Sequence, residues 1–194
     1  ITSTRHIFLF LNNGKLMRTF IATTSLFVLS WLEAALHEDE LEPLDLLHLL
    51  QTYVHHQNPS IRGGAADVVF EANQQSVLVA GVDYRIEQLL DKLLDNARDF
   101  RASGSLVKVR LYQQDYDCYL EVENTGPSIP PDLMAGMFNS MVSARAAGAG
   151  HAHFGLGLYI VRLISQFHGG SVTAHNLRQP EGVMFRVKLP ILLV

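Results

Sequence analysis

The sequence has 194 residues, of which 48% are hydrophobic and 18% are charged, the composition of a globular protein with one or two domains. Its formal net charge of −4 gives no general attraction for nucleic acid or for an anionic membrane, so nucleic acid is excluded as an expected partner. The single cysteine, Cys118, cannot form an internal disulfide and is expected to be a buried apolar side chain.

The first 42 residues have the pattern of helices. Apolar residues recur at steps of three and four over 15–37, which predicts one helix with a stripe that packs on another helix. A turn signal at 12–14 precedes it, so residues 1–11 are expected to end an antiparallel helix. The most apolar part, 20–32, is too short to span a membrane. Pro43 follows an acidic run and ends the helical region, which predicts domains at 1–42 and 43–194.

The rest of the sequence mixes helices and strands without a regular β-α-β order. Helices are predicted at 44–56, at 84–100 and from 157 to about 168, and strands at 68–72, 76–80, 106–113, 118–123, 171–175 and 183–189. The helix at 84–100 has the clearest period, with six apolar residues on one face: Ile86, Leu89, Leu90, Leu93, Leu94 and Ala97. This mixture predicts an α+β layered domain.

A cation, an amide and an aromatic ring lie in one row on the helix at 84–100. Lys92, Asn96 and Phe100 follow one another at steps of four residues, away from the leucine face. Such a row can meet the phosphate, metal and base of a nucleotide. It is equally compatible with a solvated polar face that ends in an aromatic residue.

Two glycine-bearing loops follow this helix. After the strand at 118–123, Asn124 begins a turn in which Gly126 permits a positive φ and a close approach to a ligand, although a plain turn is the simpler interpretation. The second loop, 148–157, opens a helix whose free N–H groups can face an anion, but it follows no β-α-β strand, which disfavours a Rossmann site. His151 and His153 in this loop lack a cysteine or HExxH partner, so we expect no metal there.

Taken in order and with their spacing, these motifs resemble the N, G1, F and G2 boxes of sensor histidine kinases of two-component systems. The matching stretches are 93–100, 124–130, 137–145 and 154–158, followed by a glycine-plus-phenylalanine element at 181–185. The resemblance covers residues 43–194 and implies the Bergerat ATP-binding fold, a two-layer α/β sandwich shared with gyrase, Hsp90 and MutL (GHKL). The stretch 138–145 further resembles kinases associated with proteobacterial sortase systems.

The resemblance implies a site for ATP and Mg²⁺. Asn96 matches the Mg²⁺ ligand, Phe100 the aromatic wall against adenine, and Asn124 the residue that reads the adenine amino group. Other matched positions are the nucleotide-binding Gly126, Ser128, Gly155, Leu156 and Gly157, and the phosphate-contacting Arg145.

Several residues depart from the family pattern. Asn124 replaces the usual aspartate, which predicts weaker or less selective nucleotide binding because an amide lacks the charge. Ser128 and His153 replace glycines. Lys92 lies where gyrase, Hsp90 and MutL have a water-activating glutamate, and a protonated lysine cannot be that base. Lys92 can instead neutralise phosphate charge, which favours phosphoryl transfer over hydrolysis.

The resemblance implies a protein-histidine kinase that transfers the γ-phosphate to a histidine for relay to a response regulator. Residues 1–42 resemble the second helix of a dimerisation hairpin, which implies a homodimer through the N-terminal helices. His6 lacks the acidic residue and proline that follow the acceptor histidine, so we expect the acceptor upstream. Two alternatives stay open: a degenerate nucleotide-binding signalling module without phosphotransfer, and a GHKL-type ATPase.

The expected location also follows from the resemblance. Because the sequence begins with Ile1 rather than methionine, we expect it to be part of a longer chain. The implied protein is a bacterial inner-membrane kinase of which this is the cytoplasmic portion. Contact with the membrane is expected only through segments upstream of this sequence.

Overall fold

The computed structural model describes residues 33–36, 38–58, 67–139 and 156–193. The chain divides into two compact units, Ile1–Asp39 and Glu40–Val194. In the first unit, residues 33–36 and 38 are helical, as predicted for the end of the helix at 15–37. Within the described chain, no helix is both long and apolar enough to cross a membrane.

Several predictions for the first unit fall outside the described residues. These are the turn at 12–14, the helix before it, the apolar stretch at 20–32 and the position of His6. They stay predictions.

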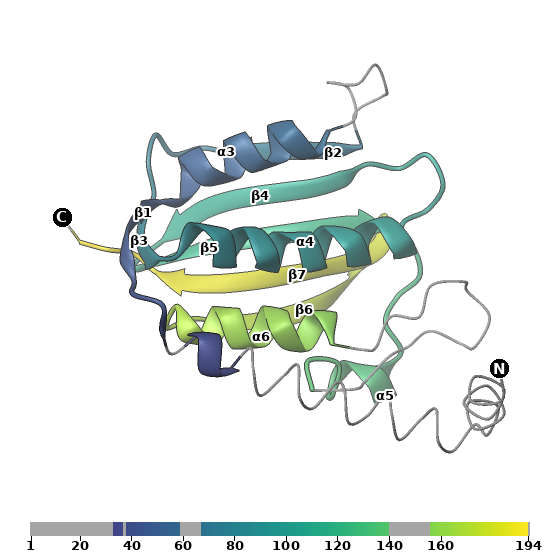
Figure 1. Ribbon diagram of the computed structural model, residues 1–194. Coiled ribbons are helices and arrows are strands. Elements are labelled where there is room, and N and C mark those ends of the chain that lie inside the picture. Colours follow the sequence, from purple (N-terminus) through teal and green to yellow (C-terminus); the bar gives the residue numbers. More distant parts are fainter. Residues whose placement is uncertain (1–32, 37, 59–66, 140–155, 194) are drawn as a thin grey trace, which may run out of the picture. The chain divides into compact units, whose positions relative to one another are not determined.

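A five-stranded sheet forms the centre of the second unit, as far as the chain is described (Figure 1). Its strands lie in the order β2, β4, β5, β7 and β6, with the bounds Val68–Ala72, Val107–Gln114, Asp117–Thr125, Glu181–Pro190 and Ser171–Arg178. β2 runs parallel to β4, and the other neighbouring pairs are antiparallel. A separate antiparallel pair joins β1 (Glu42–Asp45) to β3 (Leu78–Gly81).

Helices cover one face of this sheet (Figure 1). They are α3 (Leu46–Gln57) beside β2, α4 (Asp83–Phe100) over β4 and β5, and α6 (Gly157–Phe167) over β6 and β7. The short α5 (Pro131–Met134) follows β5. One layer of helices on one mixed sheet is a two-layer α/β sandwich, so the predicted α+β class is confirmed.

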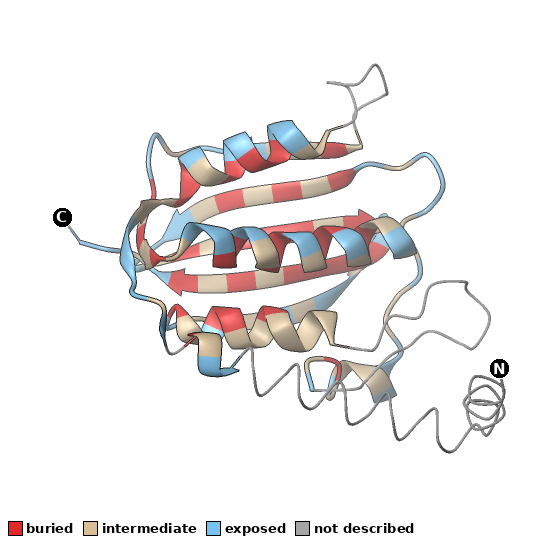
Figure 2. Ribbon diagram, in the orientation of Figure 1, coloured by how far each residue is buried: buried red, intermediate tan, exposed pale blue. Residues whose placement is uncertain are grey.

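The helix α4 forms the middle of the core. All six apolar residues predicted for its inner face are at most 1% exposed, and Figure 2 shows the buried stripe facing the sheet. Burying one leucine side chain contributes roughly 2 kcal/mol, so burial of this stripe strongly favours packing of α4 on the sheet. The helix ends at Phe100, because the backbone of Arg101 is extended.

Two predicted boundaries near the start of the second unit were wrong by two residues. The helix predicted from 44 begins at Leu46, because the Asp45 carboxylate accepts hydrogen bonds from the amides of Leu47 (3.0 Å) and His48 (3.4 Å) and caps it. The strand predicted at 76–80 starts at Leu78, since the Val77 amide also donates to Asp45 (3.3 Å). Both shifts have one cause, the cap formed by Asp45.

Candidate functional site

The predicted row on α4 connects two other motifs of the sequence. Lys92, Asn96 and Phe100 are all half-buried. At one end of the row, a Cβ added to Gly157 would lie 3.8 Å from Cδ of Lys92. At the other end, a Cβ added to Gly126 would lie closer than 3.0 Å to the carbonyl oxygen of Phe100. The row therefore runs from the first turn of α6 to the turn after β5, with Asn96 one helical turn from each end.

The last buried residue of β5 on the helix-facing side is polar. Cys118, Leu120, Val122 and Asn124 alternate along this side, and Asn124 is only 2% exposed. Its amide nitrogen donates to the carbonyl oxygen of Thr125 at 3.4 Å, the one hydrogen bond of this side chain among the described residues. That distance is beyond the usual 2.7–3.2 Å range. An apolar row thus ends in an amide whose hydrogen-bonding capacity is largely unused.

Two glycines allow the backbone to approach closely around Asn124. Gly126 has a φ of 156°, in the positive range that the sequence allowed for it, and any side chain there would collide with the Phe100 backbone. Gly182 pairs with Thr125 in the sheet, and a Cβ on it would lie closer than 3.0 Å to the carbonyl oxygen of Asn124. A side chain at either glycine would push α4 or β7 away from this end of β5.

The loop after Gly126 is held by the β6–β7 hairpin. The amide and the hydroxyl of Ser128 donate to one carboxylate oxygen of Glu181, at 3.2 and 2.8 Å. Asn176 accepts from the Ile129 amide (2.8 Å) and donates to its carbonyl oxygen (2.9 Å). The sequence assigned Ser128 to the site but gave no signal for Asn176. Glu181 was marked only as the residue before Gly182.

The start of α6 leaves backbone donors for an anion. Leu156 is its half-buried N-cap residue, and no described side chain caps the helix there. The first turn, beginning at Gly157, also contains no acidic residue. Free N–H groups and the helix dipole favour an anion at this end.

The remaining predicted positions of the F and G2 matches are only partly covered by the described residues. Arg145, Gly155, His151 and His153 lie outside the described residues. The described part of the F-box match packs onto the domain: Met137 is buried, the ring of Phe138 meets that of Phe185 edge-on, and Asn139 accepts a 2.9 Å hydrogen bond from Arg162. No group of three or more histidine, cysteine, aspartate or glutamate side chains that could hold a metal occurs in the described ranges.

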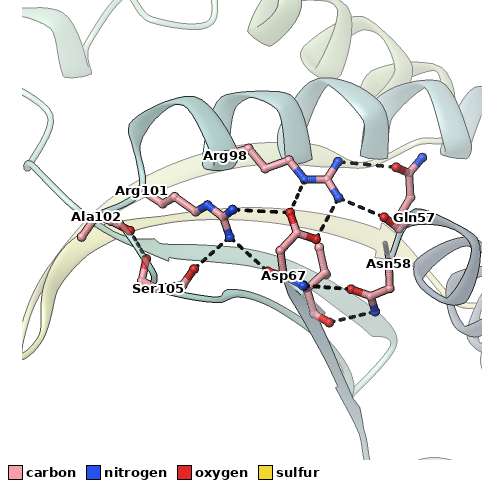
Figure 3. Close-up of polar contacts among 8 residues, drawn as sticks. Gln57, Asn58, Asp67, Arg98, Arg101, Ala102 and Ser105 are labelled. Atoms are coloured by element: carbon pink, nitrogen blue, oxygen red, sulfur yellow. Dashed lines mark hydrogen bonds and ion pairs between the residues drawn. The ribbon is translucent and has the colours of Figure 1, made fainter. Parts of the chain in front are cut away.

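A network of ion pairs and hydrogen bonds connects the last turn of α4 to neighbouring segments (Figure 3). Arg98 binds both carboxylate oxygens of Asp67, at 2.9 and 3.2 Å, and reaches the end of α3 at Gln57. Arg101 bonds the Ser105 carbonyl oxygen (2.8 Å) and lies 3.6 Å from the Asp67 carboxylate. These contacts join the end of α3 and the segments just before β2 and β4 to the turn that carries Phe100. The sequence prediction missed them, because Asp67 and Arg98 are 31 positions apart.

Comparison with known proteins places this geometry in a family. Residues 81–193 match the family described as histidine kinase-, DNA gyrase B-, and HSP90-like ATPase. The sensor protein ChvG of Agrobacterium fabrum is 32% identical over 173 residues, 83% of this chain and 29% of that protein. The sensor protein kinase PmrB of Pseudomonas aeruginosa is 27% identical over 124 residues, 64% of this chain and 26% of that protein.

Solved structures give the same grouping. The catalytic domain of histidine kinase ThkA has a TM-score of 0.66 at 27% identity, covering 78% of this chain and 96% of that chain. The mycobacterial sensor histidine kinase MprB has a TM-score of 0.64 at 26% identity, covering 79% and 99%. The chain spans less than a third of the length of these two curated relatives, 29% of ChvG and 26% of PmrB.

Proposed function

The chain belongs to the histidine kinase-, DNA gyrase B- and HSP90-like ATPase family and carries a histidine kinase catalytic domain, and we propose that this domain binds Mg-ATP and transfers the γ-phosphate to a histidine. One observation carries the proposal. The row of Lys92, Asn96 and Phe100 ends at Gly157 on one side and at Gly126 on the other. A nucleotide lying along this row would meet both glycine loops.

The two ends of the row suit the two ends of a nucleotide. Phe100 and the buried Asn124 lie near Gly126, where an aromatic wall and an amide can hold a base. Lys92 and the first amides of α6 lie near Gly157, where positive charge and N–H donors can hold phosphates. Gly155, Leu156 and Arg145 are proposed to complete the phosphate end from the sequence match alone.

Asn96 suits a Mg²⁺ ion that is shared with substrate phosphates better than a metal site made only of protein ligands. Mg²⁺ prefers oxygen ligands, keeps several waters and is commonly bound by one or two protein groups together with substrate phosphates. Asn96 offers one amide oxygen between the two ends of the row, and the described residues offer no cluster of three metal-binding side chains. Mg²⁺ held there supplies charge neutralisation at the phosphates.

Lys92 favours phosphoryl transfer rather than hydrolysis. Its Nζ lies 3.9 Å from a carboxylate oxygen of Asp95, in a pair whose side chains are 36% and 56% exposed. An ammonium group cannot take a proton from water, but it can offset phosphate charge. The acceptor imidazole is itself a nucleophile, so the work of this domain is to position ATP.

The wider role follows from what the relatives are called. They are sensor proteins and sensor kinases, which supports relay of the phosphoryl group to a response regulator and dimerisation through the first unit. We place the acceptor histidine upstream of this sequence and the domain on the cytoplasmic side of a bacterial inner membrane. These statements are proposals about the whole protein.

Calorimetric titration with ATP tests the metal role of Asn96. The wild-type chain is expected to bind ATP at least tenfold more tightly with Mg²⁺ than with EDTA, and Asn96→Ala to lose that difference while keeping its affinity in EDTA. Asn73→Ala, an exposed asparagine between β2 and β3, is the matched control and should behave as wild type. Unchanged Mg²⁺ dependence in Asn96→Ala would show the metal assignment to be wrong.

Phosphotransfer is tested with the full-length kinase and γ-labelled ATP. An acid-labile, alkali-stable label on a histidine is expected, and Asn96→Ala should remove it. Tight ATP binding without any histidine label would favour the degenerate signalling module. Steady-state release of phosphate by this chain alone, faster than label transfer, would favour the GHKL-type ATPase.

A further inference from the structure

We propose that Asn124 makes this site accept 6-oxopurine nucleoside triphosphates, such as inosine triphosphate (ITP), about as well as ATP. The inference rests on the proposed function, because it takes the end of the row at Phe100 and Gly126 as the place of the base. It goes further by naming the class of base admitted and the residue that decides it.

The position of Asn124 suits contact with the polar edge of a purine. It is 2% exposed and ends the row of Cys118, Leu120 and Val122, so the group at this end of the core is an amide instead of an apolar side chain. A Cβ on Gly126 would contact both the Asn124 amide nitrogen, at 3.3 Å, and the Phe100 carbonyl. The amide therefore lies beside the turn that contacts the backbone of Phe100, the residue whose ring is proposed as the wall of the base site.

An amide and a carboxylate read this edge differently. Adenine presents a 6-amino donor beside an N1 acceptor, whereas hypoxanthine and guanine present a 6-oxo acceptor beside an N1–H donor. Where the side chain contacts the 6 position rather than N1, as the family match implies for Asn124, a carboxylate accepts from the adenine amino group but repels a 6-oxo group, because it has only acceptor atoms. A carboxamide has one acceptor and one donor, and half a turn about its last side-chain bond exchanges them. Asn124 can therefore pair with either edge.

Such a turn requires that the amide is not already fixed by the protein. Asn176, near this end of the sheet, shows what a fixed amide looks like. Asn176 uses its oxygen and its nitrogen on Ile129, at 2.8 and 2.9 Å, so exchanging the two atoms would break both bonds. Asn124 makes one 3.4 Å bond to Thr125 within the described chain. Its orientation is left to the ligand.

Affinities for ATP and ITP, both with Mg²⁺, test the proposal directly. ITP is the probe because it differs from ATP only at the 6 position and N1, without the 2-amino group of guanine. The wild-type chain is expected to bind ITP within about threefold of ATP. In Asn124→Asp the ratio of the two dissociation constants should rise to about thirtyfold or more in favour of ATP, the range expected when a 6-oxo group faces an unpaired acceptor.

The controls separate base reading from folding and from the proposed function. Asn73→Asp adds the same charge at an exposed position and should leave the ratio at its wild-type value. Wild-type binding of ATP with ITP more than thirtyfold weaker would overturn the inference and leave the nucleotide site standing, and this measurement needs no variant to fold. Binding of neither nucleotide would overturn the proposed function as well. A folded Asn124→Asp with an unchanged ratio would show that Asn124 is not the determinant.

Discussion

Glu121 and Asn124 lie three residues apart on β5, on opposite faces of the sheet, and both are polar side chains that the fold buries. Glu121 is 3% exposed and accepts hydrogen bonds from Arg186 (2.7 Å) and Tyr112 (3.0 Å), with Arg110 at 3.1 Å. Asn124 is 2% exposed and has one long hydrogen bond among its described neighbours. Glu121 therefore has three protein partners within the described chain, whereas Asn124 has one long hydrogen bond there.

The difference separates a structural polar group from a binding one. Burial alone does not distinguish the two residues, because both are buried polar side chains. Both also come from one strand in which buried and exposed residues were predicted to alternate. The partners separate the two residues: two arginines and a tyrosine contact Glu121, while the described residues offer Asn124 only the Thr125 carbonyl oxygen. The predictions below test whether the two faces of β5 differ in this way.

The largest effect is expected at Cys118, which lies on the same face of β5 as Asn124. Burial raises the pKa of the Cys118 thiol to about 12, and the thiolate is the reactive form. Labelling of the native chain with a thiol reagent at pH 8 should therefore be slower than labelling of the urea-unfolded chain by at least about a thousandfold. Cys118 is the chain's one cysteine, so the signal is unambiguous. Fast labelling of the native chain would show that the Cys118 thiol is accessible to solvent.

The same shift fixes the sign of a pH effect on stability. The folded-state pKa of Cys118 lies above the unfolded value of about 8.5, so its contribution is complete below pH 8 or so and is lost as the pH rises toward 12. The free energy of unfolding should fall more steeply from about pH 9 to pH 11 in wild type than in Cys118→Ala. Equal slopes would contradict a buried thiol.

The second effect concerns the close approach at the site end of β5. Gly126→Ala should lower the free energy of unfolding by about 3 kcal/mol and abolish measurable ATP binding, because its Cβ would collide with the Phe100 carbonyl. Gly136→Ala is the matched control, since its Cβ would have only ordinary contact, 3.6 Å from the amide of Asn139. Urea unfolding and calorimetry measure the two quantities. A tolerated alanine at 126 would mean that α4 and β5 need not lie this close.

A further prediction compares Glu121 and Asn124 directly. Glu121→Gln removes the charge opposite Arg110 and Arg186 and should cost about 2 kcal/mol of unfolding free energy, with ATP affinity unchanged. Asn124→Ala should cost about 1 kcal/mol or less and weaken ATP at least tenfold. The reverse pattern, in which Glu121→Gln affects binding and Asn124→Ala affects only stability, would break the distinction between the faces.

Local patterns in the sequence were sufficient for most of the fold, whereas the list of site residues came from the family resemblance and stays a prediction. The six apolar residues of α4 determine both its helix and its buried face, and each predicted strand was found within a few residues. The strand β1 was missed because it has four residues, contains Pro43 and depends on pairing with β3, which lies more than 30 positions away. Period and propensity carry no signal for such a pairing.

The contacts that support the site were not predictable in the same way. Phe100 and Gly126 could be named from their own motifs, but Arg98 with Asp67 and Ser128 with Glu181 join segments 31 and 53 positions apart. An arginine on a helix and a glutamate in a hairpin are common on any protein surface. The fold alone decides which of them meet.

The smallest effect is expected at the loop held by Glu181. One carboxylate oxygen accepts both the amide and the hydroxyl of Ser128, at an exposed position where such bonds contribute about 0.5 kcal/mol. Glu181→Ala should weaken ATP about threefold with little change in unfolding. Glu181→Gln keeps an acceptor oxygen and should retain most of the wild-type ATP affinity. Glu87→Ala, at an exposed position on α4, is the control and should leave the ATP affinity unchanged. A loss above tenfold that glutamine does not restore would mean that the charge itself acts on the nucleotide. Glu181, an exposed residue of the hairpin, would then contact the nucleotide as Asn124 is proposed to do. Binding residues of this domain would then not be distinguished by a buried polar side chain that has few hydrogen-bond partners.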